Sequence, residues 1–147
     1  MKAATVFSNN IRSNIGYTVN DDNPFREYNY FHQQGRKVFK EVCPLAASHI
    51  QANVAAAGIE VGDVKRWWLH QANININMNQ LIAKKLLGRV PDNKEAPTVL
   101  DTYANTASAG SLIALTLNHE DLAAGDYGVL CSFGAGYSIG SLVLRKR

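Results

Sequence analysis

Residues 128–144 read GVLCSFGAGYSIGSLVL, and this stretch decides how the chain ends. Two apolar, strand-like runs flank the small-residue turn Gly134-Ala135-Gly136. Glycine enters a tight turn without a steric penalty, and two strands joined by so short a turn pair as an antiparallel hairpin. The sequence therefore predicts a closing β-hairpin.

Strand-like and helix-like segments alternate upstream of this hairpin. Strands are predicted at Ala3–Ser8, Arg66–His70 and Thr98–Tyr103, and helices at Arg36–Ala57, Asn77–Leu87 and Ala107–Leu117. This alternation is typical of α/β proteins, in which right-handed helical crossovers join parallel strands. We therefore expect a mostly parallel sheet with helices on both faces and one antiparallel edge strand.

Three segments depart from a simple helix or strand pattern. Residues Asn9 to Phe31 are rich in Asn, Asp and aromatic residues, which indicates a long irregular insert. Pro44 lies inside the first predicted helix and is expected to kink it or split off its first turns. The helix at Ala107–Leu117 is apolar on every side, a pattern typical of helices that are buried all round.

Length, composition and charge limit the possible classes of protein. The 147 residues, 46% of them hydrophobic, suffice for one domain spanning residues 1–147. No apolar run approaches the roughly 18 residues of a membrane span, and no secretory signal is evident, so we expect a soluble, cytoplasmic protein without a membrane partner. The net charge is +3, and the basic residues are scattered along the chain, which argues against nucleic acid as a partner. Cys43 and Cys131 form no metal-binding pair, and no metal or cofactor is expected.

Polar or glycine-rich motifs follow three of the predicted strands. They are His70-Gln71-Ala72-Asn73, Asn105-Thr106 and Phe133-Gly134-Ala135-Gly136. Functional groups of parallel α/β sheets gather at the carboxyl ends of strands, so we expect the three motifs at one edge. Each motif alone also has a structural interpretation: a hydrogen-bonded core histidine, a helix N-cap and a tight turn.

Taken together, the motifs favour an enzyme that stabilises negatively charged oxygen atoms. A neutral imidazole from His70 and the carboxamide of Asn105 can both donate hydrogen bonds to one carbonyl oxygen, as an enolate requires. Backbone N–H groups of the glycine-rich turn suit a second, tetrahedral oxyanion. This chemistry is acyl transfer with carbon–carbon bond formation. A nucleophile is missing, because Cys43 lies within a predicted helix and Cys131 within a predicted buried strand.

The order and spacing of these motifs resemble the C-terminal half of β-ketoacyl-(acyl carrier protein) synthase III enzymes. The resemblance runs from residues 7–12 through residues 35–40 to the closing hairpin. It implies a thiolase-like fold, in which each of two halves builds a five-stranded mixed sheet. The last helix of each half is then sandwiched between the two sheets, which agrees with the all-apolar helix at Ala107–Leu117.

The resemblance also implies an acyltransferase reaction and the residues that perform it. In this family a Cys of the N-terminal half, absent here, takes an acyl group from coenzyme A. Malonyl-(acyl carrier protein) is then decarboxylated and condensed with it, a decarboxylative Claisen condensation of fatty acid biosynthesis. His70 and Asn105 would bind the malonyl thioester carbonyl, the N–H of Ala135 would contribute to the second oxyanion hole, and Phe133 would line the site beside the Gly134–Gly136 turn. The chain alone is therefore predicted to be inactive.

The partners implied are the acyl carrier protein and coenzyme A thioesters. Lys84 and Lys85 are candidate contacts for the acidic carrier protein, whereas Asn75 stands where the family often has an Arg. The segment from His70 to Lys84 is two residues longer than the family pattern. The helix at Ala107–Leu117 would face the missing N-terminal half or a second copy. Two alternatives remain open: a non-catalytic binding or assembly module, and half of a related polyketide-type condensing enzyme.

Overall fold

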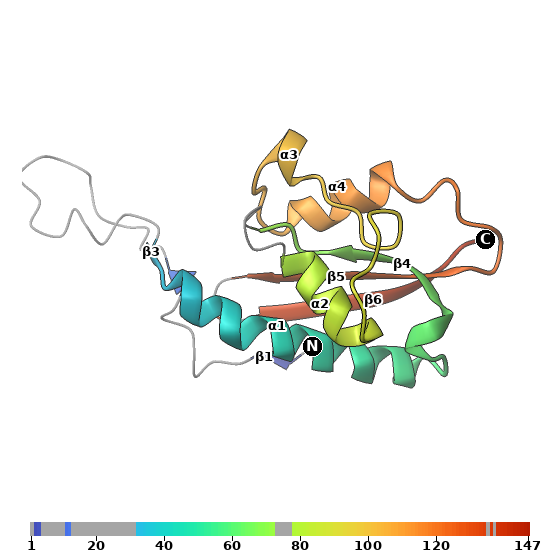
Figure 1. The fold of residues 1–147 in the computed structure, drawn as a ribbon. Helices are drawn as coiled ribbons and strands as arrows, with labels where there is room; N and C mark the ends of the chain where they lie inside the picture. Colours follow the sequence, from blue (N-terminus) through green and yellow to red (C-terminus); the bar gives the residue numbers. More distant parts are fainter. Residues whose placement is uncertain (1, 4–10, 13–31, 73–77, 135, 137) are drawn as a thin grey trace, which may run out of the picture.

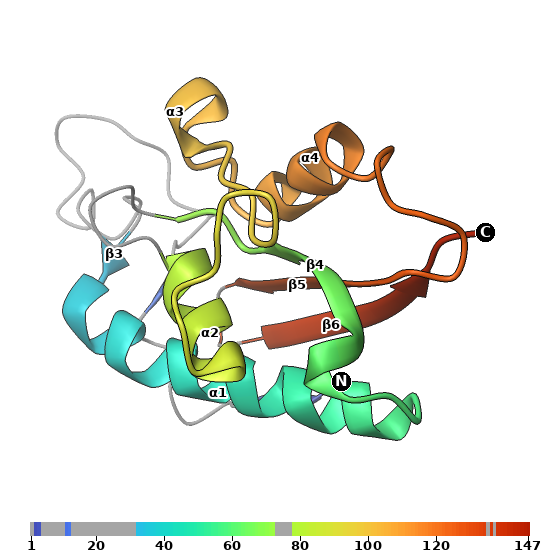
Figure 2. The ribbon, with the colours of Figure 1, turned by 45° about the vertical axis from the view of Figure 1, so that its right-hand side comes forward.

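The computed structural model places helices on both faces of a mixed β-sheet (Figures 1 and 2). It describes residues 2–3, 11–12, 32–72, 78–134, 136 and 138–147. Helices α1 (Gly35–Ala56) and α2 (Met78–Leu87) cover one face, and α3 (Leu100–Tyr103) and α4 (Ala109–Leu117) lie on the other. This arrangement confirms the predicted α/β class with helices on both faces.

The described sheet has four strands in the order β1-β6-β5-β4. Their bounds are β1 Lys2–Ala3, β4 Val64–Leu69, β5 Tyr127–Gly134 and β6 Ser138–Arg145. Strands β5 and β6 form the predicted antiparallel hairpin, and β4 runs parallel to β5. The prediction of a mostly parallel, five-stranded sheet is wrong for the described residues: two of the three pairings are antiparallel, and β6 lies inside the sheet, since β1 pairs with its outer edge.

The predicted strand at Thr98–Tyr103 is absent from the described structure. Residues 97–99 instead bond to the side chain of Gln71, and α3 begins at Leu100. The Gln71 carboxamide accepts a hydrogen bond from the Val99 N–H and donates one to the Pro97 carbonyl. Beside β4, the N–H of Trp67 donates to the carbonyl of Glu95 at 2.8 Å. Isolated bonds of this kind take the place of a strand ladder.

Helix α1 is held by a buried stripe that faces the sheet. Its buried apolar residues are Val38, Val42, Cys43, Ala46, Ala47, Ile50 and Val54. The helix continues through Pro44, so the prediction that its first turns split off is wrong, while the alternative of a kink stays a prediction. Pro44 is exposed, and the buried residues on both sides of it hold the helix against the same core.

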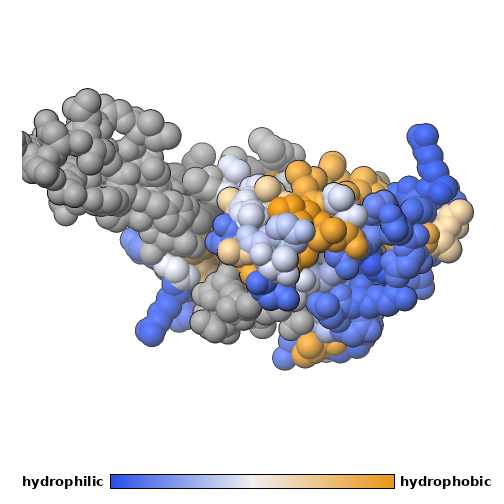
Figure 3. All heavy atoms as spheres, turned by 90° about the horizontal axis from the view of Figure 1, so that it is seen from above, coloured by the Kyte–Doolittle hydropathy of each residue, from blue (hydrophilic) through white to orange (hydrophobic). Residues whose placement is uncertain are grey.

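Helix α4 is covered by the sheet on one side only. Gly110, Ser111 and Ala114 are buried, whereas Leu112 and Leu117 are 53% and 55% exposed. Apolar surface is visible on the face of the molecule that carries α4 (Figure 3). Burial on all sides is therefore not achieved within the described part of the chain.

The N-terminal region is described only in short pieces. Strand β2 (Ile11–Arg12), near the start of the predicted irregular insert, pairs with β3 (His32–Gln33), which directly follows the insert. The rest of that insert lies outside the described residues. A short 3-10 helix, η3 (Val61–Asp63), leads into β4. Among the described helices, none is both long and apolar enough to cross a membrane.

Candidate active site

His70 follows the last residue of β4 and is buried, with 6% of its surface exposed. Its Nδ1 lies 2.9 Å from Oγ of Ser132, and its ring centroid lies 3.9 Å from that of Phe133, with 34° between the ring planes. Burial lowers the pKa of His70 from 6.5 to about 4, because the charged imidazolium loses its solvation. His70 is therefore neutral at pH 7 and has one N–H group to donate.

Gln71 connects the end of β4 to the segment that leads to Asn105. It is fully buried, and its Nε2 donates to the carbonyls of Leu69 and Pro97 at 2.9 and 3.2 Å. A Cβ added at Gly110 would lie only 2.7 Å from the Cβ of Gln71. The first turn of α4 can therefore pack directly on Gln71 because residue 110 is glycine.

Asn105 lies in the loop between α3 and α4, and its side chain is exposed. Its Oδ1 accepts a hydrogen bond from the N–H of Ala107 at 2.9 Å, which makes an Asx-type turn and not the N-cap of α4. The backbone on either side is strained, because Ala104 and Ala107 have φ angles of 54° and 53°. The carboxamide oxygen is bonded to the backbone, and the NH2 group carries the hydrogen-bond donors of the side chain, which are the groups that an oxyanion would need.

The third motif, at the end of β5, contacts His70 and also Ser108, which lies in the loop just after Asn105 and Thr106. The ring of Phe133 packs on His70, and Oγ of Ser108 donates to the carbonyl of Phe133 at 3.4 Å. Gly134 ends β5, and Gly136 has a φ of 71°, as the predicted glycine turn requires. Ala135 lies outside the described residues. The structure thus brings His70 and Phe133 into contact at the carboxyl end of β4 and β5, and the loop that follows Asn105 reaches the same strand end through Ser108.

Neither cysteine is suited to nucleophilic attack. Burial raises the pKa of Cys43 to about 11, against a smaller lowering effect of Lys85, and raises the pKa of Cys131 to about 12. Because the thiolate is the reactive form, both thiols are almost entirely unreactive at neutral pH. Lys84 and Lys85 occupy the last turn of α2 and are exposed. Asn75 lies outside the described residues.

Sequence reasoning missed the roles of Ser132 and Gln71. Ser132 interrupts an otherwise apolar strand one residue before Phe133, and that interruption is the available signal. Gln71 belongs to the His70 motif, and a Gln directly after a predicted buried strand is itself an unusual feature. Neither partner could be identified from the sequence, because the bonding residues are 62 and 26–28 positions away.

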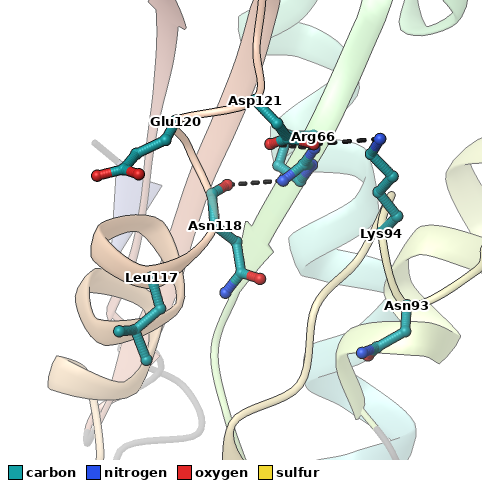
Figure 4. Close-up of a pocket in the computed structure, with 7 residues that line it drawn as sticks. All are labelled: Arg66, Asn93, Lys94, Leu117, Asn118, Glu120 and Asp121. Atoms are coloured by element: carbon teal, nitrogen blue, oxygen red, sulfur yellow. Dashed lines mark hydrogen bonds and ion pairs between the residues drawn. The ribbon is translucent and has the colours of Figure 1, made fainter.

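A separate surface pocket of about 430 Å³ lies toward the start of β4 (Figure 4). Buried Arg66 donates two hydrogen bonds of 3.0 Å to the carboxylate of Asp121 and one to the carbonyl of Asn118. Lys94 also pairs with Asp121. These contacts join β4 to the segment after α4 and include none of the predicted site residues. Within the described ranges, no three His, Cys, Asp or Glu side chains are grouped to hold a metal ion.

Comparison with solved structures supports the fold. The chain superimposes on β-ketoacyl-[acyl carrier protein] synthase III of Thermus thermophilus with a TM-score of 0.79 at 24% identity. The match covers 99% of this chain and 44% of that one. The likeness shows a thiolase-like α/β fold.

Comparison of sequences identifies the family. The chain is 56% identical over 144 residues to the β-ketodecanoyl-[acyl-carrier-protein] synthase of Pseudomonas aeruginosa. The match covers 97% of this chain and 41% of that protein. It is 38% identical over 118 residues to the β-ketoacyl-[acyl-carrier-protein] synthase III of Symbiobacterium thermophilum, covering 79% of this chain and 34% of the relative. The chain thus spans less than half the length of these relatives. Residues 54–146 match the family of the 3-oxoacyl-[acyl-carrier-protein (ACP)] synthase III C terminal. The chain therefore belongs to the 3-oxoacyl-[acyl-carrier-protein] synthase III family, of which it covers the C-terminal part.

Proposed function

We propose that residues 1–147 form the C-terminal catalytic domain of a condensing enzyme of fatty acid biosynthesis. The enzyme would join an acyl group, delivered by coenzyme A, to malonyl-(acyl carrier protein) by decarboxylative Claisen condensation. The observation that carries the proposal is the neutral, buried His70 at the same sheet edge as the Asn105 loop and the Phe133 turn.

His70 and Asn105 act in the decarboxylation step. The bond between the malonyl carboxylate and its α-carbon breaks, CO₂ leaves, and the electron pair moves onto the thioester to form an enolate. His70 and the NH2 group of Asn105 donate hydrogen bonds to the enolate oxygen. A neutral histidine suits this role, because its N–H donates a hydrogen bond to the enolate oxygen. Unlike an imidazolium, it is too weak an acid to protonate the reacting carbon.

The condensation step needs an acylated thiolate. The α-carbon attacks the acyl thioester carbonyl, the new carbon–carbon bond forms, and the thiolate leaves when the tetrahedral intermediate collapses. The N–H of Ala135 contributes to the oxyanion hole of that intermediate, and Phe133 lines the site beside Gly134 and Gly136. Since burial raises the pKa of both Cys43 and Cys131, the nucleophile would come from outside this chain.

The acyl group is proposed to have eight carbons. The Pseudomonas relative, 56% identical, is named for a β-ketodecanoyl product. A ten-carbon 3-oxoacyl product arises when an eight-carbon acyl group gains two carbons from malonate. By extension, this domain would serve the condensation of an octanoyl group.

Two surfaces are proposed to bind macromolecules. Exposed Lys84 and Lys85 would contact the acidic carrier protein through charge attraction. The exposed leucines of α4, Leu112 and Leu117, would pack against the other half of a longer enzyme or against a second copy. The cytoplasmic location expected from the sequence stays a prediction.

A hybrid enzyme tests the catalytic proposal. This chain replaces the matching C-terminal part of the Pseudomonas synthase, and the hybrid is given octanoyl-coenzyme A and malonyl-(acyl carrier protein). The expected product is a 3-oxodecanoyl thioester. His70→Ala and Asn105→Ala should each reduce malonyl decarboxylation by about 100-fold or more, yet leave octanoyl transfer onto the enzyme's Cys intact by mass spectrometry.

Acyl transfer is the internal control, because it shows that the hybrid is folded and that its nucleophile works. Decarboxylation that survives both substitutions would overturn the catalytic proposal and favour a binding or assembly module. In the isolated chain, an octanoyl adduct on Cys43 or Cys131 would show that the nucleophile lies here after all.

A further inference from the structure

The hydroxyl of Ser132 lies in hydrogen-bond contact with the ring of His70. Its Oγ lies 2.9 Å from Nδ1, within normal hydrogen-bond distance. Ser132 is half-buried in β5, between Cys131 and Phe133, which are both buried. Nδ1 of His70 is the hydrogen-bond partner that the described residues supply to this hydroxyl.

The direction of this hydrogen bond follows from the donors and acceptors available. A neutral imidazole carries its proton on one nitrogen and accepts through the other. If Nδ1 carried the proton, Oγ of Ser132 would accept a hydrogen bond from Nδ1–H. The hydroxyl hydrogen of Ser132 would then have no acceptor among the described residues. If Nε2 carries the proton, Ser132 donates to Nδ1, and both groups are satisfied by one bond.

Phe133 complements this bond. Its ring lies against the imidazole at a centroid distance of 3.9 Å and therefore restricts the plane of the ring. The hydroxyl of Ser132 restricts the orientation of the ring within that plane. Two consecutive residues of β5 can both reach His70 because His70 follows Leu69, which pairs with Cys131 in the sheet register.

We propose that Ser132 is a positioning residue that donates to Nδ1 of His70 and thereby holds the histidine as the Nε2–H tautomer. The inference rests on the proposed function for its purpose, since Nε2–H is then the group that donates to the thioester oxygen. It concerns the proton position on His70, which is measurable without any substrate.

Nitrogen-15 NMR of the 147-residue chain, with labelled histidine, tests the proton position directly. In the wild type, the His70 signals should report a protonated Nε2 and an unprotonated, hydrogen-bonded Nδ1 at about pH 7. Ser132→Ala should give a mixture of tautomers, and Ser132→Thr, which keeps the hydroxyl, should restore the wild-type pattern. Ser141→Ala is the matched control, because this hairpin serine bonds to Asn53.

The hybrid synthase supplies a second readout. Ser132→Ala should lower kcat for malonyl decarboxylation roughly 3- to 10-fold, the effect of one lost neutral hydrogen bond, with KM unchanged. Ser132→Thr should recover the loss. The inference is overturned if wild-type His70 carries its proton on Nδ1, or if Ser132→Ala leaves the tautomer pattern unchanged. Decarboxylation that is insensitive to His70→Ala would overturn the proposed function instead, while the tautomer signals would still report on Ser132.

Discussion

Burial of His70 makes the stability of the chain depend on pH. The pKa of His70 is lowered to about 4 from 6.5, so the unfolded chain binds a proton more readily than the folded chain. Stability is therefore fully present above about pH 6.5, falls as the pH decreases toward 4, and levels off below that. The loss from this residue is on the order of 3 kcal/mol.

Urea unfolding of the wild type and a His70→Gln variant, at about pH 7.5 and about pH 5, checks this prediction. The variant should lose less stability between the two conditions, because it has no imidazole to protonate. Carboxylates titrate in both proteins, and their contribution cancels in the difference. Equal losses in the two proteins would contradict the prediction.

Strain next to Asn105 gives a second prediction at the scale of single residues. Ala104 has φ 54° and ψ −158°, a region that is populated almost only by glycine. Ala104→Gly should therefore stabilise the chain by about 1 kcal/mol, after allowance for the greater freedom of glycine in the unfolded state. Ala52→Gly, at an exposed position within α1, is the control and should destabilise by a similar amount. Chemical denaturation gives the free energy of unfolding of both variants. A decrease of that free energy in Ala104→Gly would refute the strain argument.

At this scale the sequence pattern points to candidate site residues but not to the groups that orient them. The rule that chemistry in α/β proteins gathers where strands end places His70 directly after β4 and Phe133 near the end of β5, whereas Asn105 follows helix α3 and not the predicted strand. A serine inside a strand has many ordinary explanations, and the partner of Ser132 becomes visible only when β4 and β5 pair. The role of Ser132 therefore depends on a long-range contact that local patterns do not contain.

At the scale of elements, the ring of Trp68 in β4 packs closely on Gly128 of β5. A Cβ built at Gly128 would lie 2.2 Å from an atom of the Trp68 ring, which is 2% exposed and bonded through Nε1 to the Asn118 carbonyl. Gly128→Ala should therefore destabilise the chain by about 3 kcal/mol, because the ring cannot move without losing that bond. Its matched control is Gly140→Ala in β6, where nothing lies within 4 Å and a change within about 0.5 kcal/mol is expected. Midpoints of urea unfolding compare the two variants, and equal shifts would be evidence against the packing argument.

Elements with a strong local pattern were predicted well, and elements set by distant side chains were not. Helix α1 and the β5–β6 hairpin have clear apolar periods, and both formed close to the expected bounds. Thr98–Tyr103 has strand-like composition, yet the buried carboxamide of Gln71 binds the backbone at its start, and α3 follows. Strand number was the least predictable feature, because it depends on pairings between residues far apart in the chain.

At the scale of the whole molecule, the exposed apolar face of α4 is expected to determine whether the isolated chain self-associates. Leu112 and Leu117 are more than half exposed, and burying such surface contributes about 25 cal/mol per Å². We expect the isolated chain to self-associate through this face at micromolar concentration. Leu112→Asp should shift the population toward monomer in sedimentation velocity. Val90→Asp, at an equally exposed apolar residue outside α4, should leave it unchanged. A wild-type chain that sediments as a monomer throughout would contradict the expectation.

The side chain of Gln71 joins two parts of the molecule that the backbone separates by a long stretch. One carboxamide is bonded to the end of β4, next to His70, and to residues 97–99, which lead to Asn105. The segment that leads to Asn105 is thereby tied to the strand end that carries His70 by a single, fully buried side chain. Substitutions in the loops around the site can therefore accumulate without separating the histidine from the asparagine, whereas a change at Gln71 would move both at once.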